Sequence, residues 1–469
     1  MTKDSSTRRS AILAIILVSY VMIVLDISIV ITGLPKIHTD LGFTDAGLSW
    51  VSSAYTLTFG GFLLLGARAG DILGRRRMFI IGLGIFAISS VLIGFAQAPV
   101  WLISARAIQG IGSAILAPST LALLQTNFPA GPERTRAISY YASAAGISAS
   151  IGLVLGGILA EWLSWRVGFF INLPIAAALI IATRKNVEET ERRSGTFDIA
   201  GAILSMAAMT ALVFGFVNAA ETGWQNDVTD ISLLAGIVLL IAFVFAEWRA
   251  RQPIMPLRLF ASRERSGAYL ARMLFLGANV GFFFFATQFM QSVGHYSPAM
   301  TGLAFLPAMV VNFVSALMAP RLMRKIGQGP VLAGSILLGM LGVGWLTQLT
   351  SSTTYLGGLA LPMLLIGIGQ GGALGPLTTS GISNVATEDA GAASGLVNVA
   401  HQLGSSLGLG VLVAAASFNA DAFAGIALLT HRVTNAMTAG TVMLGAALLV
   451  VSLLIIRSPE GSRSIKTSA

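Results

Sequence analysis

The chain has 469 residues, of which 55% are apolar and only 10% are charged, and its formal net charge is +9. A soluble protein of this length carries about a quarter charged residues, so the composition excludes a soluble globular protein. The chain has no cysteine and four scattered histidines, which excludes disulfides and thiolate metal sites, and we expect neither a metal nor a cofactor.

Long apolar runs follow one another along the whole chain. A helix that crosses a bilayer needs roughly 20 mostly apolar residues, and helices satisfy their own backbone hydrogen bonds. The first run is too long for a cleavable signal peptide and lacks a small-residue cleavage site. We therefore predict 14 membrane-spanning helices, at residues 11–34, 48–67, 78–98, 100–125, 137–160, 167–183, 199–219, 231–246, 267–290, 301–320, 331–349, 355–381, 391–418 and 436–456.

The basic residues support this count. If the N-terminus is cytoplasmic, the inside segments hold 24 Lys and Arg, whereas the outside segments hold only Lys36, Arg166 and Arg432. Such a bias is typical of membrane proteins. The positive charge therefore reflects topology, and we expect both termini in the cytoplasm and no nucleic-acid partner.

Two loops indicate an internal repeat. Residues 68–77 read RAGDILGRRR, and a weaker copy, RLMRKIGQG, begins at Arg321; aligning Gly74 with Gly327 gives an offset of 253 residues. Chance similarity in apolar sequence is the alternative explanation. The repeat predicts two six-helix bundles, as is common in transporters, with two inserted membrane helices between them. The predicted domains are residues 11–183, 199–246 and 267–456.

Asp26 lies well inside the first span, where an acidic side chain is costly and usually functional. An acid in that setting can bind and release a proton, which is the property that a coupling site needs. A purely structural Asp is the alternative. Arg106, in the fourth span, is a second deep charge, and we expect it to pair with Asp26 intermittently or to gate its proton; a fixed structural pair is the alternative.

Other polar residues lie in the spans of the second half. The offset of 253 brings Asn279 to the position of Asp26, so we expect only the first half to bind a proton. His401 either titrates or packs through hydrogen bonds. We predict that the following residues line a cavity, the alternative being hydrogen bonds between helices: Asn279, Gln288, Gln291, Asn312, Asn398 and His401.

Small residues predict close helix packing. They recur at intervals of four on one face of the fifth span, which lets another helix approach closely. The stripe consists of Ala144, Ser148, Gly152, Gly156 and Ala160, with Gly157 beside it. Residues 367–376, GIGQGGALGP, predict a helix in the twelfth span that can bend.

Several motifs resemble the major facilitator superfamily, specifically its 14-span drug/proton antiporter branch of multidrug efflux pumps. They cover nearly the whole chain: LDISIVITGLP at 25–35, ARAGDILGRRRMF at 67–79, LISARAIQGIGSA at 102–114, WRVGFFINLP at 165–174 and GAASGLVNVAHQLGSSLG at 391–408. One departure is GLVLGG in the fifth span, where Leu153 replaces the proline of the branch's antiporter motif. His401 also stands where an arginine is common.

The resemblance implies a rocker-switch transporter in a bacterial cytoplasmic (inner) membrane. Asp26 would bind either a proton or a cationic substrate. Asp71 would cap the following helix and, with Gly74, Arg75 and Arg76, steady one conformation. Relatives that export divalent cations carry further acids in later spans, which are absent here, so we expect proton-coupled export of small amphipathic, monovalent or neutral compounds by a monomer.

Two other functions compete with multidrug efflux. One is a dedicated exporter of a single metabolite or antibiotic. The other is a non-transporting membrane protein such as a sensor or a lipid-modifying enzyme. The longest loops hold about twenty residues and no catalytic cluster, so we expect no enzyme.

Overall fold

A computed structural model describes residues 3–128, 132–190, 192, 197–250, 252–386 and 389–456, and every regular element in these ranges is helical. Thirteen described helices are long and apolar enough to cross a membrane. The predicted span at 137–160 falls on α5 (Pro132–Trp162), whose described apolar part, Ile147–Trp162, is shorter. The prediction of an all-helical membrane protein is therefore confirmed. Some basic residues counted above lie outside the described ranges: Arg193, Arg251, Arg457, Arg463 and Lys466.

The chain forms two compact units. Unit 1 contains the residues up to Phe43, Trp50–Ala202 and Ser297–Leu303, and unit 2 contains Thr44–Ser49, Ile203–Tyr296 and the residues from Ala304 onward. The two helices predicted as an insertion thus belong almost entirely to unit 2.

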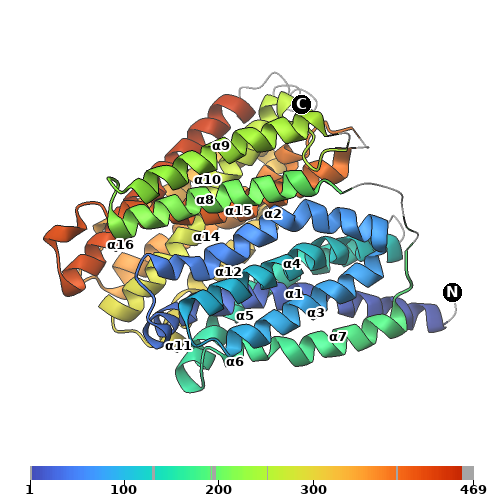
Figure 1. Ribbon diagram of the computed structural model, residues 1–469, viewed down its shortest axis with the longest axis horizontal. Coiled ribbons are helices and arrows are strands. Elements are labelled where there is room, and N and C mark those ends of the chain that lie inside the picture. Colours follow the sequence, from blue (N-terminus) through green and yellow to red (C-terminus); the bar gives the residue numbers. More distant parts are fainter. Residues whose placement is uncertain are drawn as a thin grey trace. The chain divides into compact units, whose positions relative to one another are not determined.

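Unit 1 is a helical bundle in which long helices pack side by side (Figure 1, blue to green). Its helices are α1 (Lys3–Leu41), α2 (Trp50–Leu73), α3 (Arg75–Gly94), α4 (Pro99–Asn127), α5, α6 (Val167–Phe170) and α7 (Asn172–Asn186). The α2 and α4 backbones approach closely because α4 has a glycine at the contact: a Cβ on Gly110 would lie 2.1 Å from Thr58 Oγ1. That hydroxyl also donates to the Ala107 carbonyl at 2.8 Å.

The small-residue stripe of α5 lies against α1. A Cβ on Gly152 would lie 2.6 Å from the Ser28 Cβ, and one on Gly156 would lie 2.6 Å from the Ile29 Cα. Ser148, on the same helix, is buried and donates to the Ala144 carbonyl. The helix that carries Asp26 is therefore held along α5 by contacts that leave no room for larger side chains.

The start of α11 (Pro298–Ala304) also packs in unit 1, against the end of α5. A Cβ on Gly157 would lie 2.2 Å from the Pro298 carbonyl oxygen, and one on Gly302 would lie 2.5 Å from the Leu153 carbonyl oxygen. Glu161 accepts a hydrogen bond from the Ala299 N–H at 3.0 Å. Leu153 is 3% exposed, so the residue in the family proline's place is part of the packed core.

Unit 2 contains the remaining helices (Figure 1, green to red). They are α8 (Ile199–Thr222), α9 (Asp227–Arg249), α10 (Arg263–Gln288), α12 (Leu306–Ile326), α13 (Gln328–Trp345), α14 (Leu361–Gly381), α15 (Ala390–Ala416) and α16 (Gly425–Val450). Short 3₁₀ segments include η1 (Gly47–Ser49) and η2 (Leu257–Ala261), and a π-helical turn, η3 (Phe289–Val293), follows α10.

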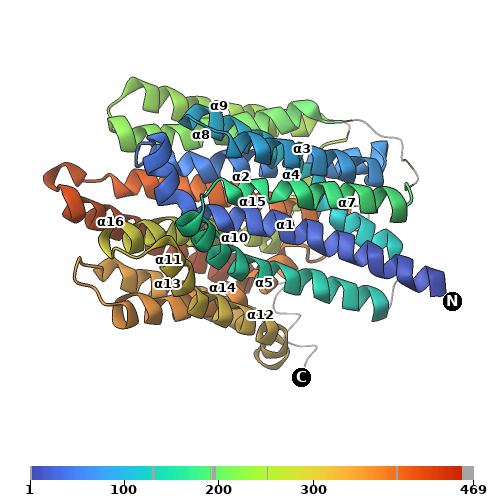
Figure 2. The ribbon, with the colours of Figure 1, turned by 90° about the horizontal axis from the view of Figure 1, so that it is seen from below.

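The inserted helices α8 and α9 run side by side (Figures 1 and 2). Gly215 of α8 faces Leu233, and Gly236 of α9 faces Leu212, in both cases with less than 3 Å between a built Cβ and the leucine side chain. Only 17% of the most apolar stretch of α9 is buried. Its apolar outer face is suited to contact with lipid.

Glycines in unit 2 mark the closest helix contacts. A Cβ on Gly408 of α15 would lie 2.2 Å from the Gly277 Cα of α10. In α14, one on Gly367 would lie 2.4 Å from the Ala308 carbonyl oxygen, and one on Gly371 would lie 2.1 Å from the Asn312 carbonyl oxygen. The glycine-rich run predicted to bend is therefore a continuous helix here, whose glycines accommodate α12.

The loop before α15 is tied to η2 by an ion pair. Arg258 Nε lies 2.6 Å from Asp389 Oδ2, and Arg258 Nη2 lies 2.7 Å from the other carboxylate oxygen. This hydrogen bonding to the guanidinium holds the pKa of Asp389 below its usual range.

Candidate functional site: a buried ion pair in unit 1

Asp26 lies in the interior of unit 1 and is 1% exposed. Its neighbours along α1 are apolar, and the most apolar 18-residue stretch of the span Arg8–Leu41 has a mean hydropathy of 2.7. A carboxylate so far from water is stable in its charged form only if other groups donate hydrogen bonds to it. The surrounding helices supply such donors.

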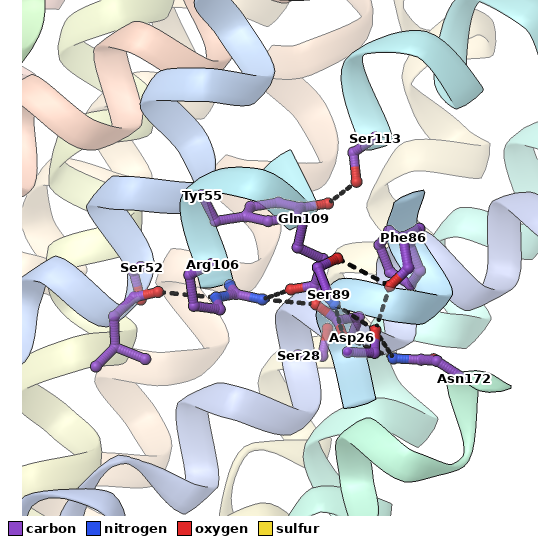
Figure 3. Close-up of polar contacts among 12 residues, drawn as sticks. Asp26, Ser28, Ser52, Tyr55, Phe86, Ser89, Arg106, Gln109, Ser113 and Asn172 are labelled. Atoms are coloured by element: carbon purple, nitrogen blue, oxygen red, sulfur yellow. Dashed lines mark hydrogen bonds and ion pairs between the residues drawn. The ribbon is translucent and has the colours of Figure 1, made fainter. Parts of the chain in front are cut away.

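Three side chains from two other helices bind the carboxylate (Figure 3). Arg106 Nη1, on α4, donates to Oδ2 at 2.7 Å. Gln109 Nε2, one turn further along α4, donates to Oδ1 at 2.8 Å, and so does Asn172 Nδ2 at the start of α7. Asp26 and Arg106 therefore form a direct, buried ion pair.

The donors are themselves held in place. Gln109 Nε2 donates to Ser90 Oγ of α3 at 2.8 Å, and Asn172 Nδ2 lies 3.2 Å from the same hydroxyl oxygen. Gln109 Oε1 accepts from Arg106 Nη1 at 2.6 Å. The site therefore joins α1, α3, α4 and α7 in one network whose side chains are all at most 2% exposed.

Arg106 has further partners besides the carboxylate. Its Nε donates to the Val51 carbonyl of α2 at 3.0 Å, and its guanidinium carbon lies 4.3 Å from the centre of the Tyr55 ring. The Tyr55 hydroxyl and Ser113 Oγ are 2.7 Å apart. These contacts hold the guanidinium in place independently of Asp26, through a backbone acceptor and a cation–π contact.

Sequence reasoning missed the neutral members of this network. Gln109 lies three residues after Arg106, a spacing that puts both side chains on one face of α4. Asn172 stands in the WRVGFFINLP stretch, but no spacing rule connects that segment to Asp26. Ser90 gave no signal, because one hydroxyl in an apolar helix is common.

Unit 2 has an uncharged network at the position that the internal repeat relates to Asp26. Asn279 Oδ1 accepts from Gln370 Nε2 at 2.5 Å, and Gln370 Oε1 accepts from Asn312 Nδ2 at 3.1 Å. This amide network joins α10, α14 and α12. Its bonds need no charged partner and no bound proton.

The other predicted lining residues have different surroundings. His401 Nδ1 lies 3.2 Å from Arg272 Nη2, whose guanidinium also donates to Thr378 at 2.9 Å. Asn398 is exposed and donates to a carbonyl of its own helix. Gln291 is half-buried in η3, and Gln288 lines a cavity at the end of α10.

The predicted cap of α3 is wrong. The Asp71 carboxylate, in the last turn of α2, accepts from Arg75 Nη2 at 3.0 Å and makes no cap bond to the α3 backbone. Instead, Glu189 accepts from the backbone N–H groups of Arg76 and Arg77, each at 3.0 Å. The Asp71 carboxylate is taken up by the Arg75 guanidinium, whereas Glu189, from the segment after α7, reaches the free N–H groups at the start of α3.

Glu189 follows α7 and fills the space beside Gly74. Gly74 has φ 103°, and a Cβ there would lie 2.6 Å from the Glu189 Cδ. Thr190 Oγ1 accepts from the Arg75 N–H at 3.2 Å, and Arg76 Nη2 donates to the Arg184 carbonyl at 3.0 Å. A glycine is thus required both by the backbone angle and by the capping carboxylate.

Within the described ranges, no three His, Cys, Asp or Glu side chains are grouped so as to hold a metal ion. The charged groups of the site are one acid and one base, embedded in helices that cross a membrane. These features define a polytopic membrane transporter with a buried ion pair.

Comparison with known proteins agrees with this class. The chain matches the Major Facilitator Superfamily over residues 16–409 and belongs to that family. It is 39% identical to a cephamycin export protein of Amycolatopsis lactamdurans over 91% of both chains. It is 37% identical to the puromycin resistance protein pur8 of Streptomyces alboniger, over 85% of this chain and 80% of that one.

Solved structures share the fold. A peptide transporter bound to sulfate aligns with a TM-score of 0.69 and 15% identity over 97% of this chain and 95% of that one. A bacterial homologue of the lysosomal transporter Spinster aligns with a TM-score of 0.68 and 15% identity over 100% of this chain and 99% of that one. The chain is a multi-pass inner-membrane transporter, as its sequence predicted.

Proposed function

We propose that this protein exports small amphipathic compounds, monovalent cations or neutral molecules, in exchange for protons that bind at Asp26. The relatives named above, together with a multidrug resistance protein of Mycobacterium tuberculosis that is 34% identical over 83% of this chain and 73% of that one, are export or resistance proteins. The observation that carries the proposal is the fully buried Asp26–Arg106 pair. A single proton bound at Asp26 neutralises one member of this pair.

Protonation acts on the pair as follows. A proton on Asp26 removes the negative charge that faces Arg106, and with it the ionic part of the contact. Arg106 keeps its bonds to Gln109 and Val51, so the guanidinium stays in place as a cation without a counterion. Leaving one member of a buried pair uncompensated costs about 3–5 kcal/mol. That cost is enough to shift a two-state equilibrium by a factor of a hundred or more.

This arrangement favours an indirect exchange. The Asp26 carboxylate is enclosed by donors from α4 and α7, so a bulky cation reaches it only if these donors move. The proton and the exported compound then bind to different conformations of unit 1, so that binding of one disfavours binding of the other. We propose that the chain works as a monomer, because one chain already holds the complete ion pair.

The charge balance of the exchange sets its driving force. Export of a monovalent cation against entry of one proton moves no net charge, so the pH gradient alone drives it. Each additional proton would draw about 2.3 kcal/mol per 100 mV from the membrane potential. No acidic residue occurs in α12 or α15, which supports monovalent or neutral substrates over dications.

Transport into proteoliposomes tests the proposal. We expect a pH gradient to drive transport of a monovalent aromatic cation by the parent protein, and Asp26→Asn to abolish it while the protein remains folded. Asp40→Asn is the matched control, since Asp40 is an exposed acid on the same helix, and it should retain gradient-driven transport. Equal gradient-driven rates for Asp26→Asn and the parent would contradict the proposal.

A dedicated exporter of one antibiotic is the second candidate, favoured by the 39% identity to a cephamycin export protein. A panel of dyes, quaternary ammonium compounds and natural antibiotics separates the two. Transport of many unrelated amphipathic compounds supports multidrug efflux, and transport of a single one supports the dedicated exporter.

A further inference from the structure

Unit 2 contains a cavity outside the ion-pair site. Its volume is about 280 Å³, and it lies where α8, α10 and α15 end and α16 begins. The size is at the lower limit of pockets that hold small organic ligands. The residues that line it are Thr44, Asp45, Ala46, Ala220, Glu221, Phe285, Gln288, Val413, Ala416, Ser417, Leu429 and Arg432.

The charged residues leave this cavity with one negative charge. Arg432 and Asp45 form an ion pair with each other. Glu221, in the last turn of α8, accepts from the Thr44 hydroxyl, which is uncharged. Since the first pair is neutral as a whole, the Glu221 carboxylate gives the cavity a preference for a monovalent cation over an anion.

A buried amide adds a second acceptor. Gln288, in the last turn of α10, is 8% exposed and lines the cavity. Its Nε2 donates weakly to the Phe284 carbonyl at 3.4 Å, whereas its Oε1 accepts no hydrogen bond from the residues that the structure describes. The amide oxygen at the cavity wall is therefore available as an acceptor for a ligand that carries N–H groups or positive charge.

The remaining wall is apolar. Phe285 precedes Gln288 by three residues on the same face of α10, and Val413 and Leu429 come from α15 and α16. An aromatic ring beside a carboxylate and an amide oxygen is suited to an ammonium group with an apolar substituent. The cavity therefore combines charge, an acceptor and apolar surface for one type of ligand.

We propose that this cavity is a binding site for small amphipathic monovalent cations, with Glu221 as the residue that recognises the charge and Gln288 as the second acceptor. It gives the inserted helix α8 a role, because α8 supplies the recognising carboxylate. The proposal rests on the proposed function only for the class of compound that reaches the site. The cavity itself is independent of Asp26.

The absence of cysteine in the chain makes a direct test possible. Ser417→Cys introduces a single thiol at the cavity wall with the smallest change of side chain. In purified protein in detergent micelles, the rate of alkylation by N-ethylmaleimide, an uncharged reagent, reports access to the cavity. We expect benzyltrimethylammonium to slow this reaction in a saturable way, and benzyl alcohol and benzenesulfonate at the same concentrations to have no effect.

Variants in the Ser417→Cys background identify the residues. We expect Glu221→Gln to raise the concentration for half-protection about tenfold, equivalent to about 1.4 kcal/mol of binding. Glu221→Asp should restore part of that loss, and Gln288→Leu should also weaken protection. Asp227→Asn is the matched control, an exposed acid in the adjoining turn that does not line the cavity. Equal alkylation rates without ligand verify that each variant is folded.

The outcomes separate this proposal from the proposed function. No protection in the parent, or equal protection in Glu221→Gln, overturns the cavity proposal and leaves proton coupling untouched. Loss of protection in Asp26→Asn also overturns it, since the cation would then bind only at the coupled site. Protection that persists in Asp26→Asn supports it, even if gradient-driven transport fails in every variant.

Discussion

Replacing Asp26 and Arg106, first singly and then together, tests whether their ionic interaction stabilises unit 1. Arg106→Gln leaves a buried carboxylate with only the neutral donors Gln109 and Asn172. Asp26→Asn leaves a buried guanidinium with the Gln109 and Val51 acceptors. The double variant carries no charge at this place.

The contacts set the expected size of these effects. Removing one partner of a buried ion pair costs about 3–5 kcal/mol. We expect a value near the lower limit, about 3 kcal/mol, because each remaining charge keeps two neutral hydrogen bonds. In the double variant no charge is left uncompensated, so its cost should fall below the sum of the single costs by about 3 kcal/mol.

Thermal unfolding of purified protein in detergent micelles measures this coupling. For a unit of about 200 residues, 1 kcal/mol corresponds to about 2–4 °C, so each single variant should lose about 6–12 °C. The double variant should unfold near the temperature of the single variants. If the two losses add, the pair is not electrostatically coupled and the reasoning behind the proton site is refuted.

Two further predictions concern packing and capping. Glu189→Gln should destabilise the protein by about 1 kcal/mol, because it weakens the charged cap of α3. Asp71→Asn should cost less, since it removes only a partly exposed ion pair. A larger loss of melting temperature for Asp71→Asn than for Glu189→Gln would reverse the two assignments. Gly408→Ala should destabilise the protein by more than about 2 kcal/mol, because its methyl group would lie 2.2 Å from a backbone atom of α10. Gly375→Ala is the control, since a methyl group there would have nothing within 4 Å and should not destabilise the protein. Equal melting temperatures for the two variants would contradict the Gly408 contact.

The sequence predicted those features that depend on the residue types within a single helix. An acid and an arginine in apolar spans indicated a buried pair, because each charge alone is too costly in hydrocarbon. The stripe on α5 indicated a close helix contact, and Gly152 and Gly156 lie against α1. These features follow from composition and periodicity within single helices.

Features that depend on distant neighbours were not predictable in this way. Asn172 reaches Asp26 only because α7 packs beside α1, and Glu189 reaches the start of α3 only because the segment after α7 passes it. The family resemblance implied Asp71 as the cap of α3. Tertiary packing decided which carboxylate takes that position.

The enclosure of Asp26 also bears on how such proteins diversify. Its three hydrogen-bond donors, on α4 and α7, lie in the interior of unit 1. Under the coupling proposed for Asp26, point mutations outside this network would change the substrate and leave the proton site intact.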